Sequence, residues 1–219
     1  MHVSRLPLAA LFLSVSSTLA GAAGLPACPI QSGQTVSYDI IRGGNVIGRQ
    51  TVRYTVAGPD LTVDINLAAS LSALGVRVYN YDHHGTERWH AGQMVSLVAQ
   101  TDDNGTPRKV NATREPDGTW RGIVGASPGT APLLASSLWN AETISATRLL
   151  DRETGAIVPV RVSAAGDEVL KLGSRQVTAH KYDLAGVVSG SAWYDGSGCW
   201  VRALFHTRVD GSLVEVRAR

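Results

Sequence analysis

The sequence predicts an all-β protein: a strongly curved antiparallel sheet or open β-barrel in one domain, with at most one or two short helices. Three observations favour this fold class. Short apolar segments alternate with polar residues at period two, which is typical of antiparallel strands buried on one face. Turn dipeptides recur between these segments at regular spacing. Helical periodicity is scarce by comparison.

The first strands are expected between residues 36 and 67. Turn clusters at 43–45 (Gly-Gly-Asn) and 58–60 (Gly-Pro-Asp) divide this stretch into three segments. Each segment alternates, so a three-stranded meander is predicted. The apolar positions are Val36, Tyr38 and Ile40, then Val52, Tyr54 and Val56, then Leu61, Val63, Ile65 and Leu67.

The middle of the chain continues this pattern through residues 79–90 and through Val95, Leu97 and Ala99. Turns follow at Asn104-Gly105 and Asp117-Gly118, and two similar dipeptides occur later in the chain. Because Asn-Gly and Asp-Gly are the usual residues of type I′ hairpin turns, we predict that turn type at all four positions. The later dipeptides are Asp195-Gly196 and Asp210-Gly211.

A loop rich in Gly, Ser, Pro and Ala is predicted over residues 122–132, between the two halves of the sheet. One or two short helical turns are expected between 132 and 148. The alternation then returns, which gives ten to twelve strands in all. Its apolar positions are Val158, Val160 and Val162, then Val201, Ala203 and Phe205, then Leu213, Val214 and Val216.

The N-terminus is typical of a secretory signal peptide over residues 1–22. A basic start is followed by an apolar run over 6–19 and by the cleavage signal Ala-Gly-Ala at 20–22. The alternative is an N-terminal membrane anchor, but the apolar run is short for a span. We therefore expect a periplasmic or secreted protein with no transmembrane segment after cleavage. Residues 23–33 form an N-terminal segment, and 34–217 a single β domain.

The net charge limits the classes of partner that the protein is expected to bind. Cleavage removes Arg5 and no acid, so 19 of the 20 Lys and Arg residues remain against 18 Asp and Glu, a net charge of +1. The basic residues are also scattered along the chain. Neither feature suits a general nucleic-acid or anionic-membrane surface, and we predict no nucleic-acid partner.

Cys28 and Cys199 are the only cysteines. An exported chain with an even pair is expected to form one disulfide, here across a very long loop. Two alternatives stay open. Residues 25–28 (Leu-Pro-Ala-Cys) resemble a lipobox, which would make Cys28 a lipidated anchor in the outer membrane. Both thiols could instead be free.

The segment 79–90 is the densest in side chains that can do chemistry, and it suggests an alternative function. A hydrolytic or metal-dependent enzyme could use His83, His84, Glu87 and His90. On a strand, however, His83 and Glu87 lie on one face and His84 and His90 on the other. The simpler interpretation packs the Tyr and Trp rings against the sheet and leaves the histidines in water. We predict no metal site, no cofactor and no catalytic residue.

Two other motifs are better explained by turns. Residues 125–129 match G-x-S-x-G around Ser127, but a nucleophile elbow needs a parallel α/β sheet that this sequence does not predict. Residues 101–105 lack the spacing and the bidentate Glu of a calcium loop, and Asx capping of a hairpin accounts for them.

The rings supply much of the core, because the sequence has five Trp and six Tyr against two Phe, one of them in the leader. An apolar cavity inside a curved sheet, with ring N–H and O–H groups around its mouth, is the sharper hypothesis. It favours an apolar small molecule or lipid as partner. The candidate ligand-binding residues are Tyr79, Tyr81, His83, Glu87, Trp89, Trp139 and Trp193.

Several short motifs occur together along the chain. They are 79–89, 101–105, Leu138-Trp139-Asn140, Leu150-Asp151, Thr154-Gly155, Trp193-Tyr194-Asp195, Trp200-Val201, and Tyr38 with Val46-Ile47-Gly48. This combination resembles a bacterial family of exported proteins classed as a domain of unknown function. The resemblance spans about 34–216 and implies a single-domain β protein with no known catalytic residues. It leaves a binding or structural module of the cell envelope as the main hypothesis and the enzyme as the alternative.

Overall fold

The computed structural model describes residues 25, 27–125, 131–186, 189–207 and 210–219. The predicted signal peptide and Ser127 fall outside these residues. The described strands form one antiparallel 13-stranded sheet, in the order β7-β6-β5-β4-β3-β2-β1-β13-β12-β11-β10-β9-β8. They are β1 (Thr35–Arg42), β2 (Asn45–Ala57), β3 (Asp60–Ala73), β4 (Val76–His90), β5 (Gln93–Asp103), β6 (Thr106–Arg114), β7 (Trp120–Arg121), β8 (Arg148–Leu150), β9 (Ile157–Leu172), β10 (Arg175–Gly186), β11 (Gly190–Asp195), β12 (Trp200–His206) and β13 (Leu213–Ala218).

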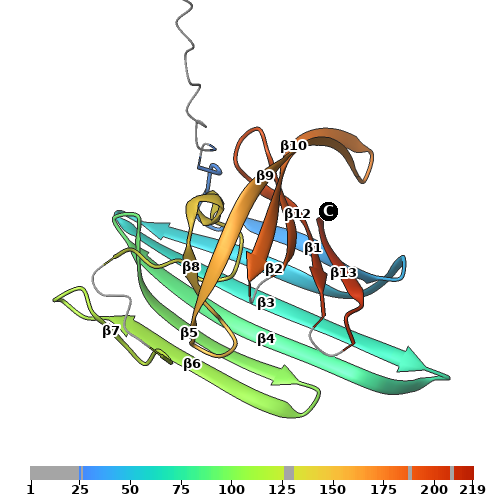
Figure 1. Cartoon of the computed structure of the whole chain (residues 1–219), viewed down its shortest axis with the longest axis horizontal. Coiled ribbons are helices and arrows are strands. Elements are labelled where there is room, and N and C mark those ends of the chain that lie inside the picture. The colour runs from blue at the N-terminus through green and yellow to red at the C-terminus, as the bar shows by residue number, and fades with distance from the viewer. Residues whose placement is uncertain (1–24, 26, 126–130, 187–188, 208–209) are drawn as a thin grey trace, which may run out of the picture.

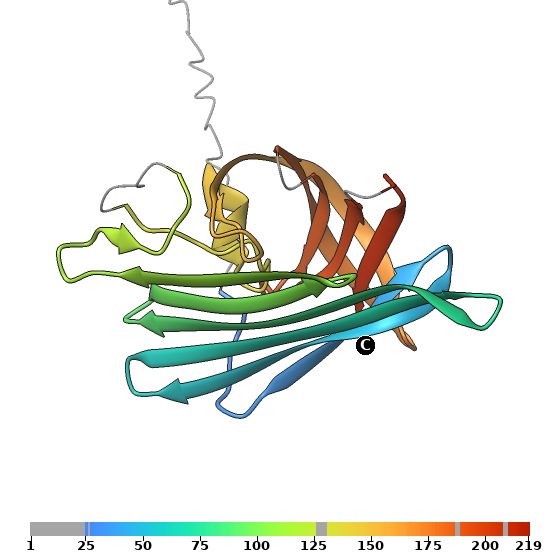
Figure 2. The ribbon, with the colours of Figure 1, turned by 90° about the horizontal axis from the view of Figure 1, so that it is seen from below.

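The all-β prediction is confirmed, with more strands than expected. The additions include β7 and β8, which have two and three residues and are too short to show a period in the sequence. The long strands β2–β6 form one wall, and β9–β13 curl over it (Figures 1 and 2). The sheet is therefore a strongly curved, open barrel.

The two edges of the sheet are joined by the connection between β7 and β8. The Val124 amide donates to the Gly155 carbonyl at 2.7 Å, and the Leu150 amide donates to the Leu134 carbonyl at 2.8 Å. Two parallel bridges, Val124 with Ala156 and Ala135 with Leu150, lie in the same region. These bonds satisfy backbone groups that an open edge would expose.

The type I′ prediction is right at Asn104-Gly105 (φ +52° and +86°) and wrong at the three Asp-Gly pairs, whose Asp residues do not have positive φ. Each of these Asp side chains accepts backbone N–H groups further along the turn, as Asp195 does from Ser197 and Cys199 at 2.9 and 3.0 Å. Such Asx turns favour longer loops. Two further turns with paired positive φ, Leu74-Gly75 and Ala91-Gly92, do not have a dipeptide typical of this turn type.

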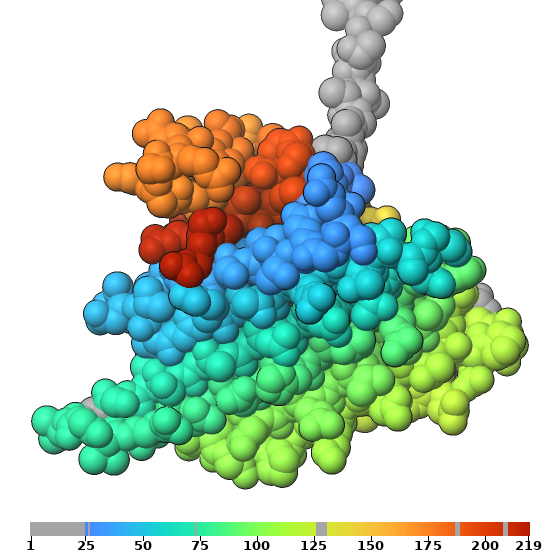
Figure 3. Space-filling view, turned by 180° about the vertical axis from the view of Figure 1, so that it is seen from behind, coloured from blue at the N-terminus to red at the C-terminus, as the bar shows by residue number. Residues whose placement is uncertain are grey.

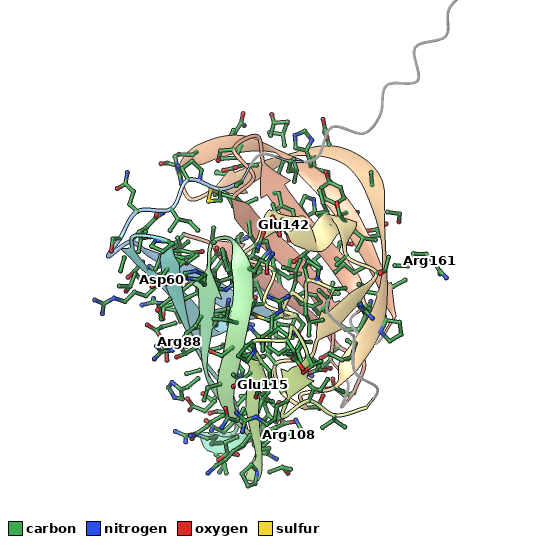
Figure 4. All side chains as sticks on the ribbon, turned by 90° about the vertical axis from the view of Figure 1, so that its left-hand side faces the viewer. Asp60, Arg88, Arg108, Glu115, Glu142 and Arg161 are labelled. Carbon is green, nitrogen blue, oxygen red and sulfur yellow. A yellow bond between two sulfur atoms is a disulfide. The ribbon has the colours of Figure 1, made fainter. Side chains whose placement is uncertain are left out.

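The concave face holds the main apolar core, to which strands from both halves contribute. A short 3₁₀ helix, η1 (Ala141–Ser145), is capped by the Asn140 side chain, which accepts the Glu142 amide at 2.9 Å. Figure 4 shows η1 and Glu142 between the strands of the first half of the chain and those of the second half. The segment before η1 places Leu138 and Trp139 in this core.

Cys28 and Cys199 form the predicted disulfide, with a Cα–Cα distance of 4.5 Å and a sequence separation of 171. Asp195 holds the β11–β12 turn that presents Cys199. The bond consumes the Cys28 thiol that lipidation would need. It ties the N-terminal segment to the second half of the sheet.

Candidate functional site

A cavity of about 500 Å³ lies inside the curved sheet. Its apolar walls come from both halves of the chain, which the curvature brings face to face. Polar residues from β4, β5 and the 151–153 loop contribute further lining. The apolar lining is Ile40, Ile47, Leu67, Ala69, Leu138, Trp200, Phe205, Val214 and Val216.

The cavity lies toward one end of the sheet, which we call the mouth end. Since neighbouring strands alternate in direction, the turns β1–β2, β3–β4, β5–β6 and β12–β13 all lie at this end. Tyr79, Asp103 and His206, which line the cavity, are close to these turns in the sequence. At the opposite end, Trp139 packs edge-on against Trp89 at 5.3 Å and against Tyr54 at 5.6 Å.

A hydrogen-bonded network borders the cavity near the mouth end, and we call it the rim network. The Tyr79 hydroxyl donates to Asp103 at 2.7 Å, and the Tyr81 hydroxyl donates to Glu153 at 2.6 Å. Arg108 on β6 donates to both carboxylates at 3.3 Å. Burial is the main cause that raises the pKa of both tyrosines. The network fastens the 151–155 loop to the wall formed by β4–β6.

Gln50 lies deep in the cavity lining with 2% of its surface exposed. It stands opposite Tyr38 on β1 and Leu67 on β3. Its side-chain Nε2 has no hydrogen-bond partner among the described residues. A buried amide donor without a partner is costly, so this group is a candidate contact for a polar atom of a ligand.

His83 is fully buried, so the expectation that the histidines face water is wrong at this position. Its Nδ1 lies 2.8 Å from the Thr101 hydroxyl, and Gly85 leaves room for the ring because a Cβ there would lie 3.0 Å from His83 Nε2. Burial, followed by Arg152 and His84, lowers the pKa of His83 to about 3. The imidazole is therefore neutral at pH 7.

Glu87 is buried between two tryptophans at the end opposite the mouth. Its Oε2 accepts the indole N–H groups of Trp89 at 3.1 Å and of Trp139 at 2.9 Å. Burial raises the pKa of Glu87, while these indoles and the Ser137 hydroxyl act in the opposite direction. The carboxyl group thereby anchors the 137–139 segment to the sheet.

The structure separates the residues of the alternative enzyme hypothesis. His83 and Glu87 are buried on the concave face, whereas His84 and His90 are exposed on the other face. His84 contacts Asn66 at 2.6 Å, and His90 contacts Asp60 at 2.7 Å. Within the described ranges, no group of three His, Cys, Asp or Glu side chains is placed to hold a metal ion.

The predicted ligand-binding residues have different positions. Tyr79 and Tyr81 line the cavity. Glu87, Trp89 and Trp139 form the packed end, while His83 is buried between the two regions.

Trp193 lies in a separate cluster with Leu170, Leu172, Ala179 and Val201. Its indole donates to Glu168 at 3.0 Å, and Arg202 lies 4.7 Å from its ring centroid. The side chain is therefore engaged in packing and polar contacts of its own.

Gln50, Arg108, Glu153 and Phe205 were not predicted as residues of the cavity or its rim network. Gln50 breaks the polarity pattern of β2, because its parity places it on the face of Val52 and Tyr54. That polar residue at an inward position was the available signal. Arg108, Glu153 and Phe205 reach the site only through contacts between segments that are distant in the sequence.

The fold and the cavity define a class: β-barrel-like proteins with a half-open pocket that is lined by both apolar and polar side chains. The chain belongs to the family DUF6134, a domain of unknown function, whose model matches residues 38–219. No curated protein matches the sequence. Among the described residues, no helix combines the length and apolar character that a membrane crossing requires.

Two solved structures are similar. One is a β-barrel-like protein of the DUF1849 family from Brucella abortus, with 10% identity, a TM-score of 0.62, and coverage of 90% of this chain and 98% of its own. At that identity the likeness concerns the fold alone. The other, from Bacteroides fragilis and described as having a YmcC-like fold, has 8% identity, coverage of 89% and 97%, and a TM-score of 0.34, too low to support a shared fold.

Proposed function

We propose that this protein is a binding module of the cell envelope that holds a lipid-like molecule inside its curved sheet. The observation that carries the proposal is the cavity of about 500 Å³, whose volume lies within the range of small-molecule sites. Nine of the 21 lining residues are apolar and supply most of the lining surface, while the other twelve are polar. Burying an acyl chain there would remove apolar surface of both partners from water.

The polar groups in the cavity support an amphipathic ligand rather than a pure hydrocarbon. The Gln50 amide can donate to a carbonyl or ester oxygen, and such a bond would satisfy its unpartnered nitrogen. Arg152 lines the cavity from the 151–153 loop and supplies a positive charge there. Asp103 and Glu153 are already bonded in the rim network, so they compete less for an incoming head group.

An acyl probe tests this proposal. Binding of dansyl-undecanoic acid to the protein purified without detergent would be followed by fluorescence, and native mass spectrometry would report any retained adduct. The variant Ala69→Phe fills the cavity from β3, because Ala69 lines it. Its matched control is Ala68→Phe, one residue earlier, where the side chain is exposed on the opposite face.

We expect saturable binding to the wild type and to Ala68→Phe, and binding at least about tenfold weaker to Ala69→Phe, since lost apolar burial translates into affinity. Equal affinity in all three proteins would show that the probe binds elsewhere. No binding to the wild type, together with a mass free of adducts, would overturn the proposal.

A further inference from the structure

Exposed apolar side chains gather at the mouth end of the sheet. Nine large apolar residues are exposed in the described part of the chain, and five of them lie in the turns at this end or on the adjoining strand ends. Three belong to the β3–β4 hairpin, which projects beyond the body of the molecule (Figure 3). The five are Val46, Leu74, Val76, Val78 and Leu213.

Leu74 is the most unusual of these residues. It is fully exposed (104%), and with Gly75 it forms a turn with φ of +52° and +77°. Asn104 and Gly105 adopt nearly the same angles in the β5–β6 turn at the same end. Asn tolerates a left-handed backbone, whereas a bulky residue such as Leu does so at a cost. The turn therefore holds a Leu in a backbone conformation that is unfavourable for it, and it exposes the apolar side chain fully to water.

The charge of this hairpin points to the kind of partner. Between Asp64 and Asp82 the sequence contains no acidic residue and one basic residue, Arg77. Val76 and Val78 flank this cation and are 64% and 55% exposed. Apolar residues that alternate with a cation match a bilayer surface, where acyl chains lie beneath anionic head groups.

The tip of the hairpin lies a short distance beyond the residues that line the cavity. Tyr79 lines the cavity, and Gly75 lies four residues nearer the tip. At a rise of about 3.3 Å per residue, the tip reaches about 13 Å beyond Tyr79. Interfacial segments enter a bilayer by about 5–10 Å, so insertion of the tip would leave the mouth end next to the head groups.

We propose that the β3–β4 hairpin tip, Leu74 to Val78, inserts into the surface of an anionic lipid bilayer and docks the mouth end there. Leu74 enters the acyl region, and Arg77 meets the head groups. The inference goes beyond the proposed function, because docking depends on the outer surface of the hairpin and not on what the cavity holds.

The test is co-flotation of the protein with vesicles of phosphatidylethanolamine and phosphatidylglycerol. The key variant is Leu74→Asn, which removes the apolar side chain and places a favoured residue in the left-handed turn. It should fold at least as well as the wild type, so a loss of flotation is not explained by misfolding. Val169→Asn is the matched control, because Val169 is 67% exposed on β9, outside this hairpin.

We expect the wild type and Val169→Asn to float with anionic vesicles, and Leu74→Asn to partition about tenfold or more weakly, the factor expected for one buried Leu side chain. Binding of the wild type to phosphatidylcholine vesicles should be weaker. Equal flotation of Leu74→Asn, or none by the wild type, would overturn the proposal. So would a concentration-dependent dimer of the wild type that Leu74→Asn abolishes, because the tip would then contact a second copy.

The soluble-probe assay described above uses no vesicles, so the two proposals can fail separately. Retained probe binding by Leu74→Asn would show that its cavity is intact.

Discussion

Removal of the disulfide should destabilise the protein through its unfolded state. The double variant Cys28→Ser/Cys199→Ser frees a segment that the bond closes over 171 residues. The chain-entropy expression for a loop of this length gives a loss of about 17 cal/mol/K, or about 5 kcal/mol at 25 °C. For a domain of this size, that corresponds to a fall of roughly 10–20 °C in the melting temperature.

The folded state should change little, because other contacts hold the N-terminal segment. The Gly33 amide donates to the Tyr54 carbonyl at 2.8 Å, and the Ser32 hydroxyl accepts the Val56 amide at 3.0 Å. Ile30 also packs against the main core. The loss is therefore expected in the unfolding free energy and not in the native spectrum.

Urea unfolding followed by tryptophan fluorescence measures this loss. The variant should unfold at lower denaturant with a larger m-value, since its unfolded chain is more open. Wild type treated with a reducing agent is the control and should match the variant. A loss below about 1 kcal/mol would refute the loop-entropy argument. A different midpoint for the reduced wild type would show that the serine side chains themselves have an effect.

Two further predictions concern Glu87 and the rim network. Because the pKa of Glu87 is raised above its usual 4.5, the folded protein binds more protons above that pH and loses stability as pH rises. The melting temperature of Glu87→Gln relative to wild type should therefore increase from pH 4 to pH 8, and a constant difference would contradict the buried-acid interpretation. Arg108→Ala removes the donor that Asp103 and Glu153 share, and because these side chains are partly exposed it should cost up to about 1 kcal/mol. Hydrogen exchange should then accelerate in 151–155 and not in β2, and uniform acceleration would argue against a local role for the rim network.

Much of the fold could be predicted because it is a local property of the chain. Alternation assigns residues to faces, and so correctly places His83, Glu87 and Trp89 on one side of β4. Strand parity alone also separates the four residues of the enzyme hypothesis onto two faces. Parity alone does not say which face is buried, and this explains why the expectation of a solvent-exposed His83 is wrong.

Turn types were less predictable, because one dipeptide suits several loops. Asp195-Gly196 has the composition of a type I′ turn, but the Asp195 side chain accepts two amides of its own loop and favours a longer turn. At Leu74-Gly75 the composition is unsuited to the angles that the chain adopts. Strand register and pairing across the hairpin decide between such alternatives.

Residue type and spacing are enough to predict the strands, their two faces and the pair of cysteines that could join. The place of Gln50 in a cavity lining and the bond from Tyr81 to Glu153, which lies 72 residues away, become known only from the folded chain. Periodicity records which side of a strand is apolar, whereas the curvature of the sheet is the summed result of twist and packing between strands far apart in the chain.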